Sequence, residues 1–222
     1  MSFRHEYKHA INYCDYLTLR TRLRTVMRQD SHAEGGRYHI RSLYFDDYRD
    51  EALREKINGI NKREKYRIRF YNMDDSYVCL EKKCKTNGLT EKFGIPITRV
   101  EAEKIIGGDT AWMADDSRTL VQELYANMKG RLLRPKTIVD YIREPYIYPI
   151  GNVRVTFDSD IRTGLSSTRI FSPDTQTVPV GDGIILEVKY DAFLPNVIRD
   201  ILQLDSRSAS AYSKYAECRK FG

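Results

Sequence analysis

Several segments of the chain alternate strictly between charged and apolar residues, a pattern typical of β-strands. In residues 63–71 the odd positions hold four cations and a tyrosine, whereas three of the four even positions are apolar or aromatic. Residues 153–162 and 184–191 alternate in the same way. Side chains two residues apart on a strand point to the same face. Each predicted strand therefore presents one charged face and one mainly apolar face.

The same patterns predict the order of the elements along the chain. Asn12 is a suitable N-cap for a helix, and residues 72–75 have the composition of a hairpin turn. Residues 86–98 contain Gly and Pro, which predicts a loop with a short strand. The predicted strands are 3–10, 37–46, 63–72, 76–85, 137–143, 153–162 and 184–191. The predicted helices are 12–28, 48–57, 99–106, 116–131, 194–204 and 210–220.

The polar faces of these strands are rich in Arg and Lys. Three strands also repeat the pattern Glu-x-Lys, at Glu6 with Lys8, Glu81 with Lys83, and Glu187 with Lys189. Cations that face each other across strands destabilise a sheet, and the acids are too few to neutralise them. A barrel of about eight strands has an interior that can hold a small ligand. We therefore predict an α+β fold: a closed antiparallel eight-stranded β-barrel, lined by the cations, with helices packed on the outside.

Composition limits the class of protein. The 222 residues are 41% hydrophobic and 31% charged, with a net charge of +6, which fits one globular domain over residues 1–222 and favours a polyanionic partner. The four cysteines form no zinc or disulfide pattern, and the N-terminus has no apolar signal segment. No run approaches the roughly 20 apolar residues of a membrane helix. We expect a cytoplasmic protein without a membrane segment in this chain.

An ordered set of short motifs resembles a known family. The motifs are Glu6-Tyr-Lys8, Arg67-Ile-Arg69, Tyr141-Ile-Arg143, the strand from Arg154 to Asp158, Glu187-Val-Lys189 and Ser213-Lys214-Tyr215. They resemble the catalytic domain of the vacuolar transporter chaperone (VTC) family, which belongs to the CYTH-like triphosphate tunnel metalloenzymes. The similarity runs over nearly the whole chain, in the same order.

The resemblance implies a tunnel that binds triphosphate or polyphosphate together with Mn²⁺ or Mg²⁺. In enzymes of the VTC type the terminal phosphate of ATP is transferred to a growing polyphosphate chain. The implied activity is thus that of a polyphosphate polymerase, a transferase. Its implied partners are ATP and inorganic polyphosphate, and no nucleic acid is expected. A separate membrane partner remains compatible with the sequence.

The resemblance also implies roles for individual residues. The implied catalytic residues are Arg67, Arg69, Lys189 and Glu187. The implied phosphate-binding residues are Lys8, Lys56, Lys83, Lys92, Arg143, Arg154, Ser213 and Lys214. Tyr141 is implied to lie beside the adenine base. Glu187 is implied to bind the metal, with Glu6, Glu81 and Asp158 as further candidate ligands.

One departure bears on the type of reaction. The hydrolytic branch of the superfamily typically begins with Glu-x-Glu-x-Lys, whereas this chain has Arg4-His-Glu6-Tyr-Lys8. The loss of an acid counts against hydrolysis by two metals and favours the VTC branch. Three alternatives stay open: a tripolyphosphatase or nucleoside triphosphatase that uses the same site, a non-catalytic polyphosphate-binding module, and, more weakly, a nucleic-acid-binding protein.

Overall fold

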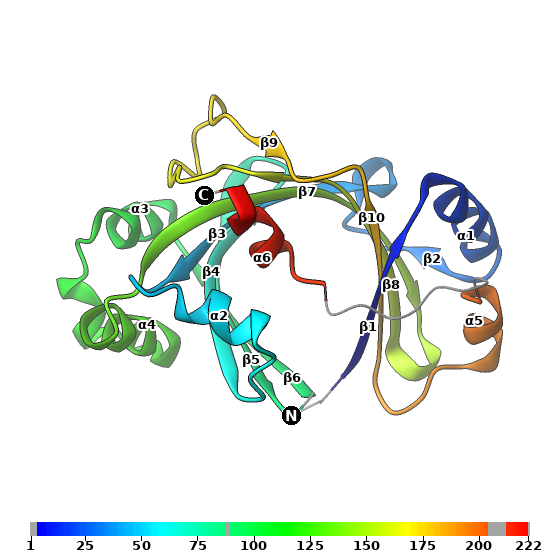
Figure 1. The fold of residues 1–222 in the computed structure, drawn as a ribbon, viewed down its shortest axis with the longest axis horizontal. Coiled ribbons are helices and arrows are strands. Elements are labelled where there is room, and N and C mark those ends of the chain that lie inside the picture. Colours follow the sequence, from blue (N-terminus) through cyan, green and yellow to red (C-terminus); the bar gives the residue numbers. More distant parts are fainter. Residues whose placement is uncertain (1–3, 88, 204–211, 222) are drawn as a thin grey trace. The chain divides into compact units, whose positions relative to one another are not determined.

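The computed structural model describes residues 4–87, 89–203 and 212–221. The chain divides into two compact units, and each is described by itself. Unit 1 consists of Met1–His39, Tyr141–Ile161 and Gly181–Tyr212, within the described ranges. Unit 2 consists of Ile40–Asp140, Arg162–Val180 and Ser213–Gly222. Both units are built from antiparallel strands and short helices (Figure 1).

The strands follow one another along a single hydrogen-bonded path. Their order is β1-β10-β8-β7-β3-β4-β5-β6, while β2 pairs with β7 and β9 with β8. The bounds are β1 His5–Ile11, β2 Arg28–Gln29, β3 Tyr38–Asp46, β4 Arg63–Tyr71, β5 Asp74–Thr86, β6 Leu89–Ile97, β7 Arg134–Tyr148, β8 Val153–Thr163, β9 Val178–Pro179 and β10 Ile184–Tyr190. The predicted α+β fold with an eight-stranded antiparallel path is confirmed.

The predicted closure of the sheet into a barrel is wrong. The strand path begins at β1 and ends at β6, and no pairing between these two strands occurs in the described parts of the chain. The sequence of β6 suits an edge strand, because Pro96 has no N–H to donate and Glu91 and Lys92 place charges along it. The sheet is therefore open.

The helices are short. They are α1 Tyr13–Val26, α2 Glu51–Ile57, α3 Arg99–Gly107, α4 Thr119–Gly130, α5 Asn196–Ile201 and α6 Lys214–Cys218, with single 3-10 turns η1 Glu34–Gly36, η2 Ala111–Asp115, η3 Ile150–Asn152 and η4 Arg219–Phe221. Asn12 caps α1 as predicted, accepting the Asp15 N–H at 2.8 Å. Of the helices in the described ranges, none has the length and apolar character needed to span a membrane.

Some predicted boundaries differ from the observed ones. Residues 89–97 form the full strand β6 rather than a loop with a short strand. β7 is 15 residues long and continues through Pro145, beyond the predicted end at 143. In the C-terminal region α5 and α6 have six and five residues, so both predicted helices are too long. Residue 3 of the first predicted strand, residue 204 of the predicted helix 194–204 and residues 210–211 of the predicted helix 210–220 lie outside the described residues.

In unit 1, helices cover one face of the strands. Leu19 and Leu23 of α1 are fully buried and pack with Phe157 of β8 and Val188 of β10. The register between β1 and β10 pairs Lys8 with Glu187, which places both on the face opposite this apolar core. Figure 1 shows α1 and α5 side by side on the covered face. Burial of the apolar face thus fixes which side chains form the polar face.

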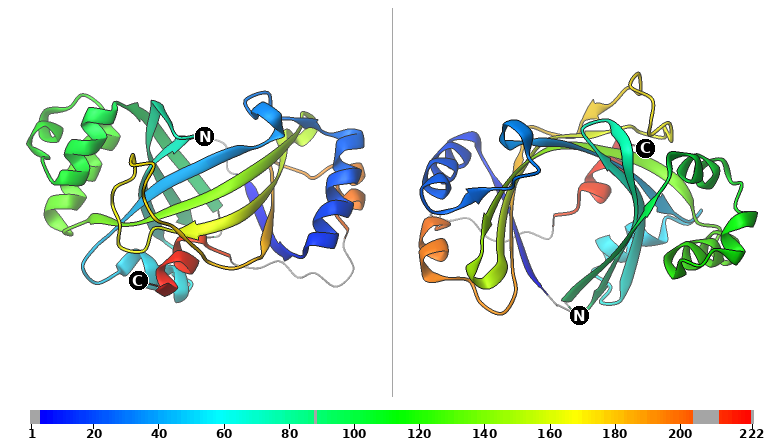
Figure 2. Two further views of the ribbon diagram at one scale, coloured as in Figure 1. Left: turned by 90° about the horizontal axis from the view of Figure 1, so that it is seen from above. Right: turned by 180° about the vertical axis from the view of Figure 1, so that it is seen from behind.

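In unit 2, α3 and α4 cover the apolar face of the strands (Figure 2). Ile68 of β4 and Leu80 of β5 are fully buried against Ile105 of α3 and Leu124 of α4. Burying such side chains contributes roughly 2 kcal/mol each. Because side chains alternate along β4, the same packing directs its arginines and lysines to the other face. The prediction of helices on the apolar faces is confirmed in each unit.

A buried carboxylate connects α1 to β7 within unit 1. Glu144 is 3% exposed and accepts hydrogen bonds from the Tyr16 hydroxyl at 2.7 Å, the Arg20 Nε at 2.8 Å and the Tyr146 hydroxyl. Burial alone would raise the pKa of Glu144, but the hydrogen bonds from these three groups outweigh it and lower the pKa. The charged form of Glu144 therefore stabilises the folded state.

We expect Glu144→Gln to lower the free energy of unfolding by about 2 kcal/mol at pH 7, because it weakens a buried charged network. The folded-state pKa lies below the ordinary value of 4.5, so the stabilisation is present above that value and is lost as the pH falls through the folded-state pKa. Urea unfolding at pH 7 and pH 3 should show a difference that shrinks at the lower pH. A difference independent of pH would contradict this account. Glu217→Gln, at a surface ion pair, is the control.

Candidate functional site

The polar face of unit 2 carries like charges in register. Lys65 of β4 lies directly opposite Lys83 of β5, and Lys83 lies opposite Lys92 of β6. Two residues along the strand, on the same face, Arg63 lies opposite Lys85. Like charges that face each other across strands destabilise a sheet. This row of cations therefore needs a compensating anion, from the protein or from a ligand.

Glu81 is the acid at the centre of this face. It is 3% exposed, and its Oε2 lies 2.6 Å from the Arg67 Nε and 3.9 Å from an Arg69 Nη, while Lys92 Nζ lies 2.5 Å from its Oε1. Burial alone would raise the pKa of Glu81, but Arg67, Arg69 and Lys92 hold it far below its usual range. Glu81 is thus charged, and both its oxygens contact cations.

Side chains of β3 orient the two arginines. Arg67 donates from an Nη to the Tyr44 hydroxyl at 2.7 Å, and Arg69 donates from Nε to the Ser42 Oγ at 2.9 Å. Both arginines are well shielded from solvent. A guanidinium fixed in this way can bind a phosphate without first losing much side-chain freedom. Arg67 and Arg69, both predicted as catalytic, therefore lie side by side in a fixed arrangement.

Lys65 is a strongly perturbed member of the face. Its Nζ lies 4.7 Å from the centroid of the Tyr215 ring. Burial is the main reason why the pKa of Lys65 falls to about 7, and the nearby cations Lys56 and Lys83 lower it further against the opposing effect of Asp46. An anion bound here would raise that pKa again.

The C-terminal motif also lies in unit 2. Ser213 is the N-cap of α6 and accepts the Ala216 N–H at 3.4 Å, and Lys214 is 9% exposed. The next residue, Tyr215, stacks on the Tyr44 ring at 5.1 Å and donates its hydroxyl to Asp46 at 2.6 Å. These contacts hold the start of α6 against the strand that carries Tyr44.

The polar face of unit 1 is arranged differently, as a chain of alternating acids and bases. Glu187 contacts Lys189 Nζ at 2.6 Å through Oε1 and an Arg143 Nη at 3.1 Å through Oε2. Glu6 contacts Lys8 at 3.0 Å and Lys189 at 3.8 Å. Burial alone would lower the pKa of Lys8, but Glu187 and Glu6 raise it above its usual value. Lys8 is therefore firmly charged.

Arg143 forms the other end of this chain. Its guanidinium binds both oxygens of Asp158, at 2.6 and 2.7 Å, and Asp158 is fully buried. The carboxylate raises the pKa of Arg143 in spite of burial, so the pair is charged. Arg143 also lies over the ring of Tyr141, which is 3% exposed. Arg154 donates to Asp30 at 2.8 Å and to the Tyr38 hydroxyl at 2.7 Å.

The two faces therefore differ in charge balance. In unit 1, ion pairs connect three acids and three cations into one chain. Its members are Glu6, Asp158, Glu187, Lys8, Arg143 and Lys189. In unit 2, Glu81 stands among several cations. The charge surplus inferred from the sequence is concentrated on the unit 2 face.

The carboxylates of unit 1 fit a metal that is held jointly with a ligand. In the described ranges, no group of three or more His, Cys, Asp and Glu residues is placed to hold a metal ion by itself. Mg²⁺ commonly binds through one or two carboxylates plus the oxygens of substrate phosphates. Glu187, with Glu6 or Asp158, provides that number of oxygen ligands. The chemistry of the donor set therefore agrees with Mg²⁺ or Mn²⁺ bound together with phosphate.

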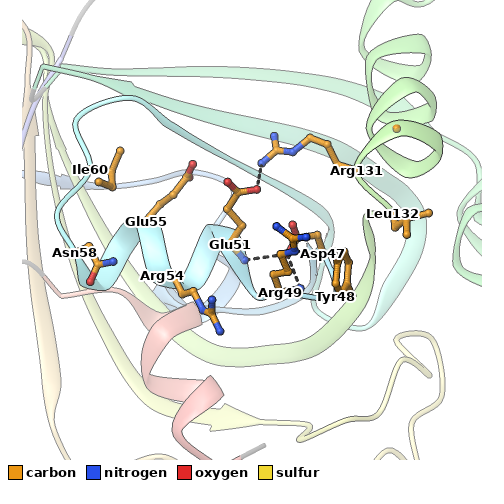
Figure 3. A pocket seen from close by; sticks show the side chains of 11 residues that line it. Asp47, Tyr48, Arg49, Glu51, Arg54, Glu55, Asn58, Ile60, Arg131 and Leu132 are labelled. Carbon is orange, nitrogen blue, oxygen red and sulfur yellow. Dashed lines mark hydrogen bonds and ion pairs between the residues drawn. The ribbon is translucent and has the colours of Figure 1, made fainter.

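A separate cavity of about 630 Å³ lies beside α2 in unit 2 (Figure 3). It contains none of the residues that were predicted to bind phosphate. Its charges are largely matched: Glu51 pairs with Arg131 at 3.0 Å, and Asp47 accepts backbone N–H groups. The cavity therefore lacks the cationic surplus of the strand face, and we place the candidate site on the strand faces.

The family of the chain follows from comparison of its sequence with known protein families. The profile of the VTC domain matches residues 3–221. The chain belongs to the VTC domain family. A search of curated proteins finds no match to this VTC domain.

Two solved structures share the fold of the VTC domain. A candidate adenylyl cyclase from Hippeastrum with a dominant triphosphatase activity has a TM-score of 0.56 and 14% identity, over 99% of this chain and 96% of that chain. A candidate adenylate cyclase from Bacillus halodurans has a TM-score of 0.51 and 12% identity, over 89% and 86%. At such low identity the similarity concerns the fold.

Sequence reasoning about the VTC domain missed three features of these faces. Tyr44 and Ser42 orient the arginines, but their strand shows no charge alternation that would single them out. Lys65 lies in the alternating strand, but only the register shows that it faces Lys83. Thr156 of β8 is assigned to the polar face by the alternation of residues 153–162, but its burial and its position opposite Glu187 appear only in the structure.

Replacing Glu81 by Gln should destabilise the ligand-free VTC domain, because Arg67, Arg69 and Lys92 lose their counter-charge. We expect the melting temperature to fall by about 5–10 °C. Tripolyphosphate should then raise the melting temperature of the variant more than that of the wild type. Differential scanning calorimetry measures both effects. Equal ligand-induced shifts would contradict this charge balance, and the exposed Glu103→Gln is the control.

Lys65 should make anion binding depend on pH. Its pKa is about 7 in the ligand-free state, so it gains a proton as the pH falls from 8.5 to 6. Sulfate keeps its charge over this range, and its affinity should rise about threefold to tenfold at pH 6. Lys65→Met should remove most of that rise, whereas Lys129→Met, at an exposed helical position, should retain it. Titration calorimetry with sulfate measures the effect, and an equal rise in both variants would disprove the assignment.

Proposed function

We propose that the chain catalyses phosphoryl transfer on triphosphate and polyphosphate, with polyphosphate synthesis from ATP as its main reaction. The observation that carries this proposal is the row of in-register cations on the unit 2 face, which surrounds the buried Glu81 and outnumbers the acids beside it. Membership of the VTC domain family supports the same reaction class. A polyanion is the ligand that such a face would bind most favourably.

The fixed cations of the unit 2 face match the requirements of phosphoryl transfer. The protein has little covalent work to do, so catalysis rests on alignment and on stabilising charge at the phosphoryl oxygens. Arg67 and Arg69 provide planar forks for bidentate contacts with phosphate. Lys83 and Lys92 provide point charges that suit a chain whose phosphates repeat. The proposed roles of Lys56, Ser213 and Lys214 place them at the same ligand.

The face of unit 1 contributes acids as well as bases. Glu187, with Glu6 or Asp158, would hold Mg²⁺ or Mn²⁺, which neutralises charge on the phosphate oxygens when it is bound. Lys189 and Arg143 are held by carboxylates in the ligand-free state. In the proposed reaction these cations would turn from the acids to the phosphate, while the acids become available to the metal.

Arg4 favours synthesis over hydrolysis. It stands where the hydrolytic branch typically has an acid, and its Nε lies 2.9 Å from the Asp191 carboxylate. Arg4 therefore adds a cation and engages an acid instead of providing one. This arrangement leaves fewer carboxylates for a second metal that would activate water.

A triphosphatase is the second candidate function. The structural neighbour from Hippeastrum is reported to have a dominant triphosphatase activity, and the structural match includes nearly the whole of this chain. Hydrolysis would use the same cations and differ only in the acceptor, water in place of a phosphate chain. Tyr141, proposed to lie beside adenine, would contribute to the binding of ATP but not to the binding of inorganic tripolyphosphate, which has no base.

Purified protein incubated with ATP and Mn²⁺ should produce long-chain polyphosphate and ADP, detectable by gel electrophoresis and by ³¹P NMR. Orthophosphate as the sole phosphate product would favour the triphosphatase. Absence of turnover with every divalent metal tested would contradict both enzymatic functions.

Glu187→Gln should reduce the turnover number at least about 100-fold, because the proposed metal ligand is lost. Tripolyphosphate binding without metal should change far less, since the cations remain. Glu217→Gln, which alters only a surface pair with Lys220, should retain wild-type turnover. Full activity of Glu187→Gln would refute the role of Glu187.

A further inference from the structure

A hydroxyl group without a partner is buried on the polar face of unit 1. Thr156 is 3% exposed, and its Oγ has no hydrogen-bond partner in the described parts of the chain. Buried polar groups in folded proteins are nearly always paired with protein, water or ligand. An unpaired hydroxyl at this position therefore requires an explanation.

The position of Thr156 connects it to the proposed site. In the strand register Thr156 lies directly opposite Glu187, and Arg154, two residues away on the same face, lies opposite Lys189. Both partner residues on β10 belong to the proposed metal and phosphate site. Thr156 thus lies beside Glu187, the proposed metal ligand, and near Arg154 and Lys189, the proposed phosphate-binding residues.

A second polar atom on this strand is also unpartnered. The Nε–H of Arg154 is buried without an acceptor, although the same guanidinium donates from an Nη to Asp30 and Tyr38. Arg154 is therefore held in place by other contacts while its Nε–H remains available. One strand thus presents an O–H donor and an N–H donor on the same face.

We propose that Thr156 is a phosphate-binding residue, whose hydroxyl donates a hydrogen bond to an oxygen of the bound phosphate chain beside the Nε–H of Arg154. This inference rests on the proposed function, because it requires a phosphate ligand on the unit 1 face. The Thr156 hydroxyl is neutral and the charge of Arg154 is balanced by Asp30, so both can donate to a phosphate oxygen without adding uncompensated charge beside the metal. The ligand class is a condensed inorganic phosphate, such as tripolyphosphate, or the phosphate moiety of a nucleotide.

The proposal predicts opposite effects on stability and on binding. Thr156→Val replaces the hydroxyl by a methyl group of similar size and removes an unpaired buried group, so the ligand-free melting temperature should stay equal or rise by about 1–3 °C. The same variant should bind tripolyphosphate at least about tenfold more weakly. Thr156→Ser, which keeps the hydroxyl, should bind within about threefold of the wild type.

Thr163→Val is the matched control on the same strand. The Thr163 hydroxyl is buried but paired, donating to the Cys218 carbonyl at 3.2 Å and accepting the Leu165 N–H at 3.1 Å. Its loss should lower the melting temperature and leave tripolyphosphate binding unchanged. The comparison separates a hydroxyl that binds ligand from one that only supports the fold.

Calorimetric titration of the full chain with tripolyphosphate, with Mn²⁺ present, and melting curves without ligand measure these effects. Wild-type affinity in Thr156→Val overturns the role of Thr156 alone and leaves the proposed function standing. A large drop in its melting temperature also overturns it, because the hydroxyl would then have a structural partner such as a bound water. If the wild type itself binds no tripolyphosphate, both the inference and the proposed function fail.

Discussion

The cross-strand opposition of lysines on the unit 2 face is the constraint on which the rest of the proposal depends. Lys65, Lys83 and Lys92 face one another over three adjacent strands, although such contacts oppose sheet formation. The apolar packing under α3 and α4 holds the strands together despite this repulsion. The fold thus maintains a cationic surface that a polyanion would stabilise. Repulsion within this surface would thus both limit the stability of the ligand-free protein and favour the proposed binding of phosphate.

The two polar faces handle charge in different ways. On the unit 1 face, acids and bases alternate and hold one another in place, so the cations are oriented but occupied. On the unit 2 face, Arg67 and Arg69 share Glu81 with Lys92, and β3 hydroxyls fix the arginines. One face therefore suits a metal together with phosphate, and the other suits phosphate alone. Glu144 plays no part in either, since its network ties α1 to β7.

Much of the fold follows from the sequence because strand parity is a local property. The alternation in residues 63–71 predicts which side chains of β4 share a face, and burial of Ile68 agrees with it. Closure of the barrel cannot be predicted in this way, because pairing between distant edge strands is non-local, and Pro96 lies in the edge strand β6 rather than in a loop. The pairing of Glu81 with three cations and the isolation of the Thr156 hydroxyl depend on register and side-chain packing, which no spacing rule provides. The roles of the individual site residues remain predictions.

A crystal structure of the protein with tripolyphosphate and Mn²⁺ tests the central claim most directly, since the anomalous signal of manganese locates the metal independently of the phosphates. We expect phosphate oxygens within hydrogen-bond distance of Arg67 and Arg69, and manganese bound to the Glu187 carboxylate. Phosphate and metal bound away from these residues, with the Arg67–Glu81 and Lys189–Glu187 pairs undisturbed, would contradict it.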